Sequence, residues 1–350
     1  MGIESDKVRI LSGVRQGRTL GSPIALLVEN ADHENWRSTM QIEPPADGPS
    51  APLTVPRPGH ADLAGVAKTG TTDVRDVLER SSARETVARV AAGAVAKAVL
   101  RVLGVTVRGR VVAIGGVGVS TAPDHTRPDS VDWAAVESSL CGCDDASAEE
   151  RMRVAVDEAR AAGESLGGIF EVWAWDLCPG VGGYASSQDR LDGRLMGALG
   201  SIPAIKGVEV GDGFSTAGSV GSLVHDPIVP MMDAGRTTVS RPTNRAGGLE
   251  GGMTNGMPVI VRVAMKPIPT LVKPLPSVDL ATLQAVSAHR ERSDVEAVAA
   301  ARVVGEAMVA WELARAVLEK FGGDSREQLM TSYDGYVDGL ERRGLWRRPS

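Results

Sequence analysis

Aromatic side chains are scarce in this 350-residue sequence, where phenylalanine, tyrosine and tryptophan together make up 3%. Proteins that stack nucleic-acid bases depend on aromatic platforms, so this scarcity argues against that class. Basic residues are not in excess either, because 38 Lys and Arg face 44 Asp and Glu, for a net charge of −6. This balance argues against a broad basic surface for nucleic acid or membrane. An anionic ligand would need a local cluster of Arg and Lys.

Cysteines and long apolar runs are also lacking. The three cysteines are Cys141, Cys143 and Cys178, and their odd number and sparse use predict free thiols in a reducing compartment. Cys141 and Cys143 could form half of a metal site, but no second half at ligand spacing follows, so we expect no metal. No run is apolar and long enough to span a bilayer, and no signal peptide opens the sequence, so we expect a cytoplasmic protein without membrane contact.

The apolar residues, 43% of the total, suffice for a sizeable core. Periodicity and turn residues predict strands near 7–11, 23–28, 106–118, 170–175 and 259–265. Helices are predicted after candidate capping boxes at Ser82 and Ser147, and then over 189–199 and 295–321. We find no convincing boundary and expect a single domain over 1–341, followed by a basic, frayed tail at 342–350.

A short proline-rich loop carries one of the five histidines. It reads Val55-Pro56-Arg57-Pro58-Gly59-His60-Ala61-Asp62. The prolines restrict the backbone, and glycine allows torsion angles that other residues avoid. The loop therefore presents an imidazole and a guanidinium on a rigid turn. On spacing alone, a surface turn with an incidental histidine is the more common explanation of this pattern.

The residues before the clearest helix form a second candidate site. Arg80, Ser81 and Ser82 precede apolar residues at alternating three- and four-residue spacing, which predicts an amphipathic helix ending at Gly104. A helix N-terminus offers unpaired N–H donors and the positive end of the helix dipole, so this segment could bind an anion. Ser82 and Glu85 also fit a capping box, and plain capping explains the pattern equally well.

Three further polar segments could contact a ligand. The glycine-rich segment 243–256 can approach a ligand closely, although it matches neither the phosphate loop nor the dinucleotide fingerprint. It leads into the strand 259–265 and then into the lysine-bearing turn 266–270, where anion contacts are frequent. Residues 289–294 gather charges before the last helix, but Ser293 or Asp294 could simply cap that helix.

Taken in order, these segments resemble the chorismate synthase family. The resemblance rests on RPGHAD at 57–62, RSSARET at 80–86, IKGVEVGDGF at 205–214, the segment 243–256, KPIPT at 266–270 and RSD at 292–294. Any one of these motifs is weak, but the ordered set is highly specific and spans nearly the whole chain.

The resemblance implies an α+β fold, a β-α-β sandwich, assembled as a homotetramer. It also implies a lyase that converts 5-enolpyruvylshikimate-3-phosphate, a small phosphorylated substrate, to chorismate and phosphate. This 1,4-elimination has no net redox change, yet it requires reduced FMN. Either the protein reduces the flavin itself with NADPH, or a separate flavin reductase does so.

Roles for individual residues follow from the same resemblance. His60 would act as the general acid toward the departing phosphate, a role that suits an imidazole, and Arg57 would hold substrate anions. Asp294 would assist proton removal at the flavin. Flavin contacts are implied for Arg80, Ser81, Ser82, Pro203, Ala204, Gly251, Lys266, Pro267, Ile268, Pro269, Thr270 and Arg292.

The beginning of the sequence departs from the family. Members open with a Gly-Glu-Ser-His-Gly segment and an arginine- and glycine-rich stretch, whereas MGIESDKV resembles the family's sequence just after that stretch. Either the start was assigned to an internal methionine, which we favour, or the chain is truly short. In the second case, the alternative function is that of a catalytically impaired flavin- or anion-binding paralogue.

Overall fold

The computed structural model describes residues 6–43, 48, 50–233, 235–289 and 294–348. The chain divides into two compact units. The first comprises Met1–Ala91 and Pro269–Arg292, and the second comprises Ala92–Ile268 and Ser293–Ser350. The prediction of a single domain over 1–341 stays a prediction, and each unit is described by itself.

The first unit consists of short strands and helices. Strand β1 (Val8–Ser12) pairs antiparallel with β4 (Ala25–Val28), close to the predicted strands. Two small hairpins are formed by β2 (Val14–Arg15) with β3 (Arg18–Thr19), and by β14 (Pro276–Val278) with β15 (Ala285–Ser287). The helices are α1 (His33–Trp36), α2 (Asp62–Thr69), α3 (Val74–Arg80) and the 3-10 turn η1 (Ala83–Glu85).

Helix α4 (Thr86–Val102) follows η1 and continues into the second unit. Its amphipathic spacing was predicted, and the helix is confirmed. Ser82 caps η1, since its side chain accepts from the Arg84 N–H. The predicted capping residue therefore lies one short turn before the α-helix itself.

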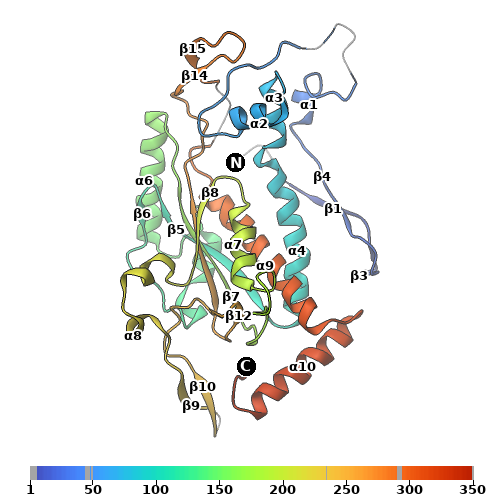
Figure 1. The fold of residues 1–350 in the computed structure, drawn as a ribbon, viewed down its shortest axis with the longest axis vertical. Coiled ribbons are helices and arrows are strands. Elements are labelled where there is room, and N and C mark those ends of the chain that lie inside the picture. Colours follow the sequence, from blue (N-terminus) through green and yellow to red (C-terminus); the bar gives the residue numbers. More distant parts are fainter. Residues whose placement is uncertain (1–5, 44–47, 49, 234, 290–293, 349–350) are drawn as a thin grey trace. The chain divides into compact units, whose positions relative to one another are not determined.

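An antiparallel sheet forms the centre of the second unit (Figure 1). Its strand order is β6 (Val117–Gly118), β5 (Thr106–Ile114), β7 (Gly168–Trp175), β13 (Val259–Met265) and β8 (Ile205–Val210). The strands predicted at 106–118, 170–175 and 259–265 are thereby confirmed. Helices and an antiparallel sheet in separate runs define an α+β fold, as expected.

Helix α9 (Val298–Phe321) packs on β5 and β7, and Figure 1 shows it lying across these strands. Close approach depends on Gly305, where a Cβ atom would lie 2.5 Å from the Phe170 ring. Polar contacts reinforce the packing at Gly109, whose N–H donates to Glu306 at 2.9 Å. Helix α7 (Leu191–Gly200) packs on α9 and β8.

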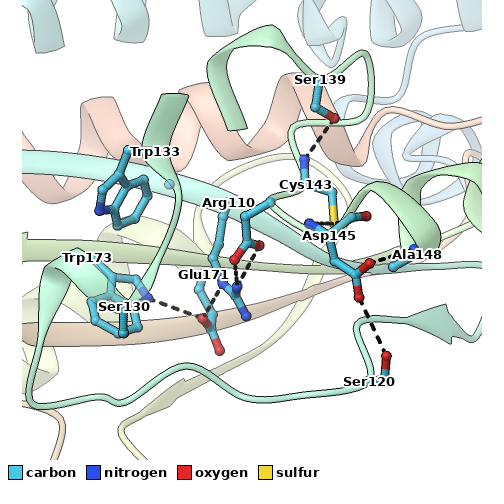
Figure 2. Close-up of polar contacts among 12 residues, drawn as sticks. Arg110, Ser120, Ser130, Trp133, Ser139, Cys143, Asp145, Ala148, Glu171 and Trp173 are labelled. Carbon is cyan, nitrogen blue, oxygen red and sulfur yellow. Dashed lines mark hydrogen bonds and ion pairs between the residues drawn. The ribbon is translucent and has the colours of Figure 1, made fainter. Parts of the chain in front are cut away.

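The opposite face of this sheet carries a row of alternating charges, called the charge row below. Ladder partners place Glu209, Arg262, Glu171 and Arg110 side by side on β8, β13, β7 and β5. Arg262 donates to Glu171 at 2.8 Å and to Glu209 at 3.2 Å. Arg110 donates to Glu171 at 3.1 Å and to Asp144 at 2.6 Å. Figure 2 shows Arg110 and Glu171 meeting beside Trp173, whose indole N–H also reaches Glu171.

The remaining elements of the second unit surround this sheet. They are α5 (Trp133–Ser138), α6 (Ala146–Ala162), α8 (Gly221–Val224), α10 (Arg326–Arg342), the 3-10 turns η2 (Pro128–Ser130) and η3 (Gly213–Gly218), and the hairpins β9 (Val229–Asp233) with β10 (Arg236–Ser240) and β11 (Leu249–Glu250) with β12 (Met253–Thr254).

Three local predictions need correction. Asp145, not Ser147, caps α6, because its carboxylate accepts from the Ser147 and Ala148 N–H groups. Figure 2 shows the contact with Ala148. Helix α9 begins at Val298, so Asp294 does not cap it, and the Glu296 carboxylate accepts from the Val298 N–H instead. The described part of the tail is not frayed, since Arg348 pairs with Asp334 of α10 at 2.6 Å.

Candidate functional site

The histidine loop of the first unit is a tight turn. The His60 N–H donates to the Arg57 carbonyl at 3.3 Å, and Gly59 has φ +77°. Proline at the second position and a left-handed glycine at the third are typical of a type II turn. The turn explains the sequence Arg-Pro-Gly-His, because it places the side chains of the first and fourth residues together. The Arg57 NH2 atom lies 3.0 Å from His60 Nδ1 and 3.2 Å from Nε2.

Asp62, at the start of α2, connects both side chains. It is completely buried, and its Oδ2 accepts from the Arg57 backbone N–H at 2.9 Å and from Nε at 3.0 Å. Its Oδ1 contacts His60 Nδ1 and accepts from Arg57 NH2 at 3.3 Å. Burial acts to raise the pKa of Asp62, but hydrogen bonds from His60 and Arg57 outweigh it and hold the pKa far below its ordinary value. Asp62 belongs to the RPGHAD motif, but the sequence alone does not predict its contacts with His60 and Arg57.

Arg57 is more deeply engaged than the predicted substrate contact requires. The side chain is 7% exposed, and besides Asp62 it donates from NH1 to the Thr270 hydroxyl at 3.2 Å. Two predicted site residues, Arg57 and Thr270, thus meet in the first unit although 213 positions separate them. Much of the guanidinium is therefore committed to orienting the loop.

In the Arg80–Ser82 segment of the first unit, the two serine hydroxyls bond within the protein, whereas the Arg80 guanidinium is exposed. Ser82 caps η1, and the Ser81 hydroxyl instead donates to the Val77 carbonyl of α3 at 2.7 Å, so both hydroxyls already bond to the backbone. Arg80 is exposed, and its guanidinium has no hydrogen bond or ion pair to any residue that the structure describes. Arg80 is the member of this segment that has donors to offer an anion.

In the second unit, several predicted residues gather at one end of the sheet. The turn of Pro203 and Ala204 precedes β8, and the Lys266 N–H, just after β13, donates to the Ala204 carbonyl at 3.0 Å. The Ile268 carbonyl accepts from Ser165 at 2.6 Å, so the segment from Lys266 through Pro267 to Ile268 lies beside the chain entering β7.

The same end of the sheet includes the segment after Asp294. The Leu166 N–H donates to the Val295 carbonyl at 2.8 Å, and Asp294 itself is exposed. Ala204 adopts φ +67°, a left-handed conformation that costs a non-glycine residue about 1–2 kcal/mol. Backbone strain of this kind concentrates at functional sites.

Gly251 lies elsewhere in this unit. It forms the tip of the hairpin of β11 and β12. Residues next to this hairpin contact the start of β13, whereas Lys266 follows the end of β13. A seven-residue strand spans roughly 20 Å, so the structure does not bring Gly251 together with the Lys266 turn within one chain. Pro269 belongs to the first unit, and Arg292 lies outside the described residues.

Metal and membrane features can also be assessed in the described ranges. No group of His, Cys, Asp or Glu in this part of the chain has the arrangement of a metal site. Cys141, Cys143 and Cys178 are free and buried, and burial raises the pKa of Cys178 to about 11. Among the described helices, none combines the length and apolar character needed to cross a bilayer.

Comparisons with known proteins define the class first. The sequence model of the chorismate synthase family matches residues 1–318. The chorismate synthase of Desulforudis audaxviator is 54% identical over 97% of this chain and 85% of its own length, and that of Trichlorobacter lovleyi is 50% identical over 97% and 87%. A crystal structure of chorismate synthase superposes with a TM-score of 0.77 at 39% identity, covering 96% of this chain and 85% of that chain. These similarities define a carbon–oxygen lyase.

The chain belongs to the chorismate synthase family. It is an enzyme that forms chorismate and phosphate from 5-enolpyruvylshikimate-3-phosphate, and the impaired paralogue is not favoured. Membership of this family also implies a reduced flavin cofactor.

Proposed function

We propose that the elimination on this chain uses His60 as the general acid toward the departing phosphate. The observation that carries the proposal is the buried Asp62 carboxylate, which fixes the His60 ring beside the Arg57 guanidinium. A fixed imidazole can transfer a proton near neutral pH, and general acid catalysis contributes about 10²–10⁴-fold. The Arg57 guanidinium would hold the substrate anions near this ring through charge-assisted hydrogen bonds.

We further propose reduced FMN as the flavin. Two observations support the fit, namely the unpartnered guanidinium of Arg80 among described residues and the clustering of the Ala204 and Lys266 turns. The residues that would hold it are Arg80, Ser81, Ser82, Pro203, Ala204, Lys266, Pro267, Ile268, Pro269, Thr270 and Arg292. When bound, reduced FMN would supply the reduced flavin that the elimination requires, and the reaction would not consume it. Gly251 stays in this set only as a prediction, since its position in one chain gives it no support.

The other finer assignments are proposals of the same kind. Asp294 would assist proton removal at the flavin, and its exposure leaves it accessible for that task. The flavin would be reduced with NADPH by this protein or by a separate flavin reductase. We propose that the protein is a homotetramer and that it is cytoplasmic. The three free thiols support the second proposal, because cysteines stay reduced in the cytoplasm.

An anaerobic assay of phosphate release tests the central proposal. The full chain, reduced FMN and 5-enolpyruvylshikimate-3-phosphate would be combined, and wild type would be compared with His60→Ala. We expect kcat to fall by about 10²-fold or more. His33→Ala is the matched control, because His33 is an exposed histidine on α1 of the same unit. Unchanged phosphate release in His60→Ala would reject His60 as the acid.

A further inference from the structure

We propose that Asp62 is a positioning residue, which holds the Nδ1–H of His60 inward and leaves Nε2 as the ring nitrogen that exchanges a proton with the substrate. This inference rests on the proposed role of His60. It goes further by assigning the reacting nitrogen and by giving a function to Asp62, a completely buried residue that the proposed function leaves without a role.

The tautomer follows from the hydrogen-bonding capacity of the carboxylate. An ionised carboxylate can only accept hydrogen bonds, and the low pKa of Asp62 keeps it ionised. Its Oδ1 is in contact with His60 Nδ1, so this nitrogen must carry a proton. In a neutral imidazole only one nitrogen carries hydrogen, which leaves Nε2 unprotonated. The Arg57 NH2 group lies 3.0 Å from Nδ1 and 3.2 Å from Nε2, and because it can only donate, Nε2 is the ring nitrogen that can accept from it.

Burial keeps the Asp62 carboxylate in its contact with His60. Asp62 is inaccessible to solvent, while the His60 side chain retains 18% exposure. No water competes for Asp62, and both of its oxygens are also occupied by Arg57 donors. The carboxylate therefore cannot rotate away from His60 without leaving a buried guanidinium unpaired, which is costly.

The proton transfer then has a defined course. As the carbon–oxygen bond of the substrate breaks, its electron pair stays on the phosphate oxygen, and the imidazolium Nε2–H gives that oxygen its proton. The ring is left neutral, with its remaining proton on Nδ1 bonded to Asp62. The same tautomer is present before reprotonation and after transfer, so the ring need not reorient between turnovers.

A nuclear magnetic resonance experiment on the full chain, free of flavin and substrate, tests the tautomer directly. Long-range ¹H–¹⁵N spectra of histidine-labelled protein would be recorded at increasing pH until the His60 ring is neutral, and His60→Ala would identify the His60 signals. We expect a protonated Nδ1 and an unprotonated Nε2 in the wild type. An Nε2–H tautomer in the wild type would overturn the proposal, and this result requires no Asp62 variant to fold.

Asp62→Asn should abolish the preference for the Nδ1–H tautomer, because an amide can turn its NH2 group toward Nδ1. Asp73→Asn is the matched control, since Asp73 is a partly buried aspartate that caps α3 and accepts from the Leu53 and Arg75 N–H groups. We expect the control to keep the wild-type His60 spectrum. A spectrum unchanged in Asp62→Asn would contradict the proposal.

A kinetic cycle separates positioning from general structural damage. Asp62→Asn should lower kcat by about 10²-fold or more in the wild type. In the His60→Ala background, the same substitution should leave kcat within about threefold, because groups that act as a unit are not additive. An equal loss of kcat in both backgrounds would overturn the proposal. If His60→Ala alone left kcat unchanged, the acid assignment would fail, whereas the spectroscopic result would still stand on its own.

Discussion

Replacing Glu171 with glutamine should strongly destabilise the protein. Glu171 is 1% exposed at the centre of the charge row, and its carboxylate accepts four hydrogen bonds. A glutamine offers one oxygen and one NH2 group, so donors from Arg262, or from Arg110 and Trp173, would face another donor. Breaking a buried ion pair by removing one partner costs about 3–5 kcal/mol, and we expect a loss in this range.

The measurement is urea unfolding of Glu171→Gln beside Glu150→Gln. Glu150 pairs with Arg153 on the surface of α6, where both side chains are more than half exposed. Such pairs contribute about 1 kcal/mol or less, so the control should unfold almost as the wild type does. A Glu171→Gln variant as stable as the control would refute the argument that this ion network is desolvated.

The pH dependence of this difference has a definite sign. The surrounding arginines hold the pKa of Glu171 below its ordinary value of 4.5, despite the opposing effect of burial. A carboxyl group with a lowered pKa stabilises the fold above its unfolded pKa, and this stabilisation is lost as the pH falls through the folded value. The gap between wild type and Glu171→Gln should therefore be full at pH 7 and should shrink below about pH 4.5.

Three further predictions concern packing, reactivity and strain. Gly305→Ala should destabilise by about 1–3 kcal/mol in thermal unfolding, because its Cβ would meet Phe170. Gly335→Ala, at an exposed position of α10 where an added Cβ meets no atom within 4 Å, should be neutral or stabilising by up to about 1 kcal/mol. Equal shifts would contradict the contact between α9 and β7. Cys178, with a pKa of about 11, should resist iodoacetamide at pH 8 until urea unfolds the chain, as mass spectrometry would show; rapid native labelling would contradict its burial. Ala204→Gly should raise the urea midpoint by relieving a positive φ worth about 1 kcal/mol, and a lowered midpoint would argue against that strain.

Repeating patterns made the main elements predictable. The three- and four-residue spacing identified α4, and alternation identified β13 with its observed bounds. Caps were less predictable because neighbouring residues compete for the same N–H donors. Asp145 precedes Ser147 and is an equally good acceptor, so the backbone geometry decides between them. The basic tail suggested fraying, but composition could not reveal that Arg348 reaches Asp334.

The site was predictable as motifs and not as geometry. The turn at Gly59 brings His60 back toward Arg57, and that turn is legible in the sequence. The function of Asp62 is not, because it depends on burial and on which oxygen meets which donor. Gly251 shows the same limit, since only the backbone contacts reveal that its hairpin lies near the start of β13, a strand's length from Lys266.

The charge row also determines how freely its members can change over evolution. Loss of Glu171, at the centre, would remove one acidic partner from each of two arginines, whereas loss of Glu209, at one end, would remove a partner from Arg262 alone among them. Tolerance to single replacement should therefore decrease from the ends toward the middle. Replacement of the negative Glu171 by a positive residue should be tolerated only if both flanking arginines also change. These positions should therefore co-evolve.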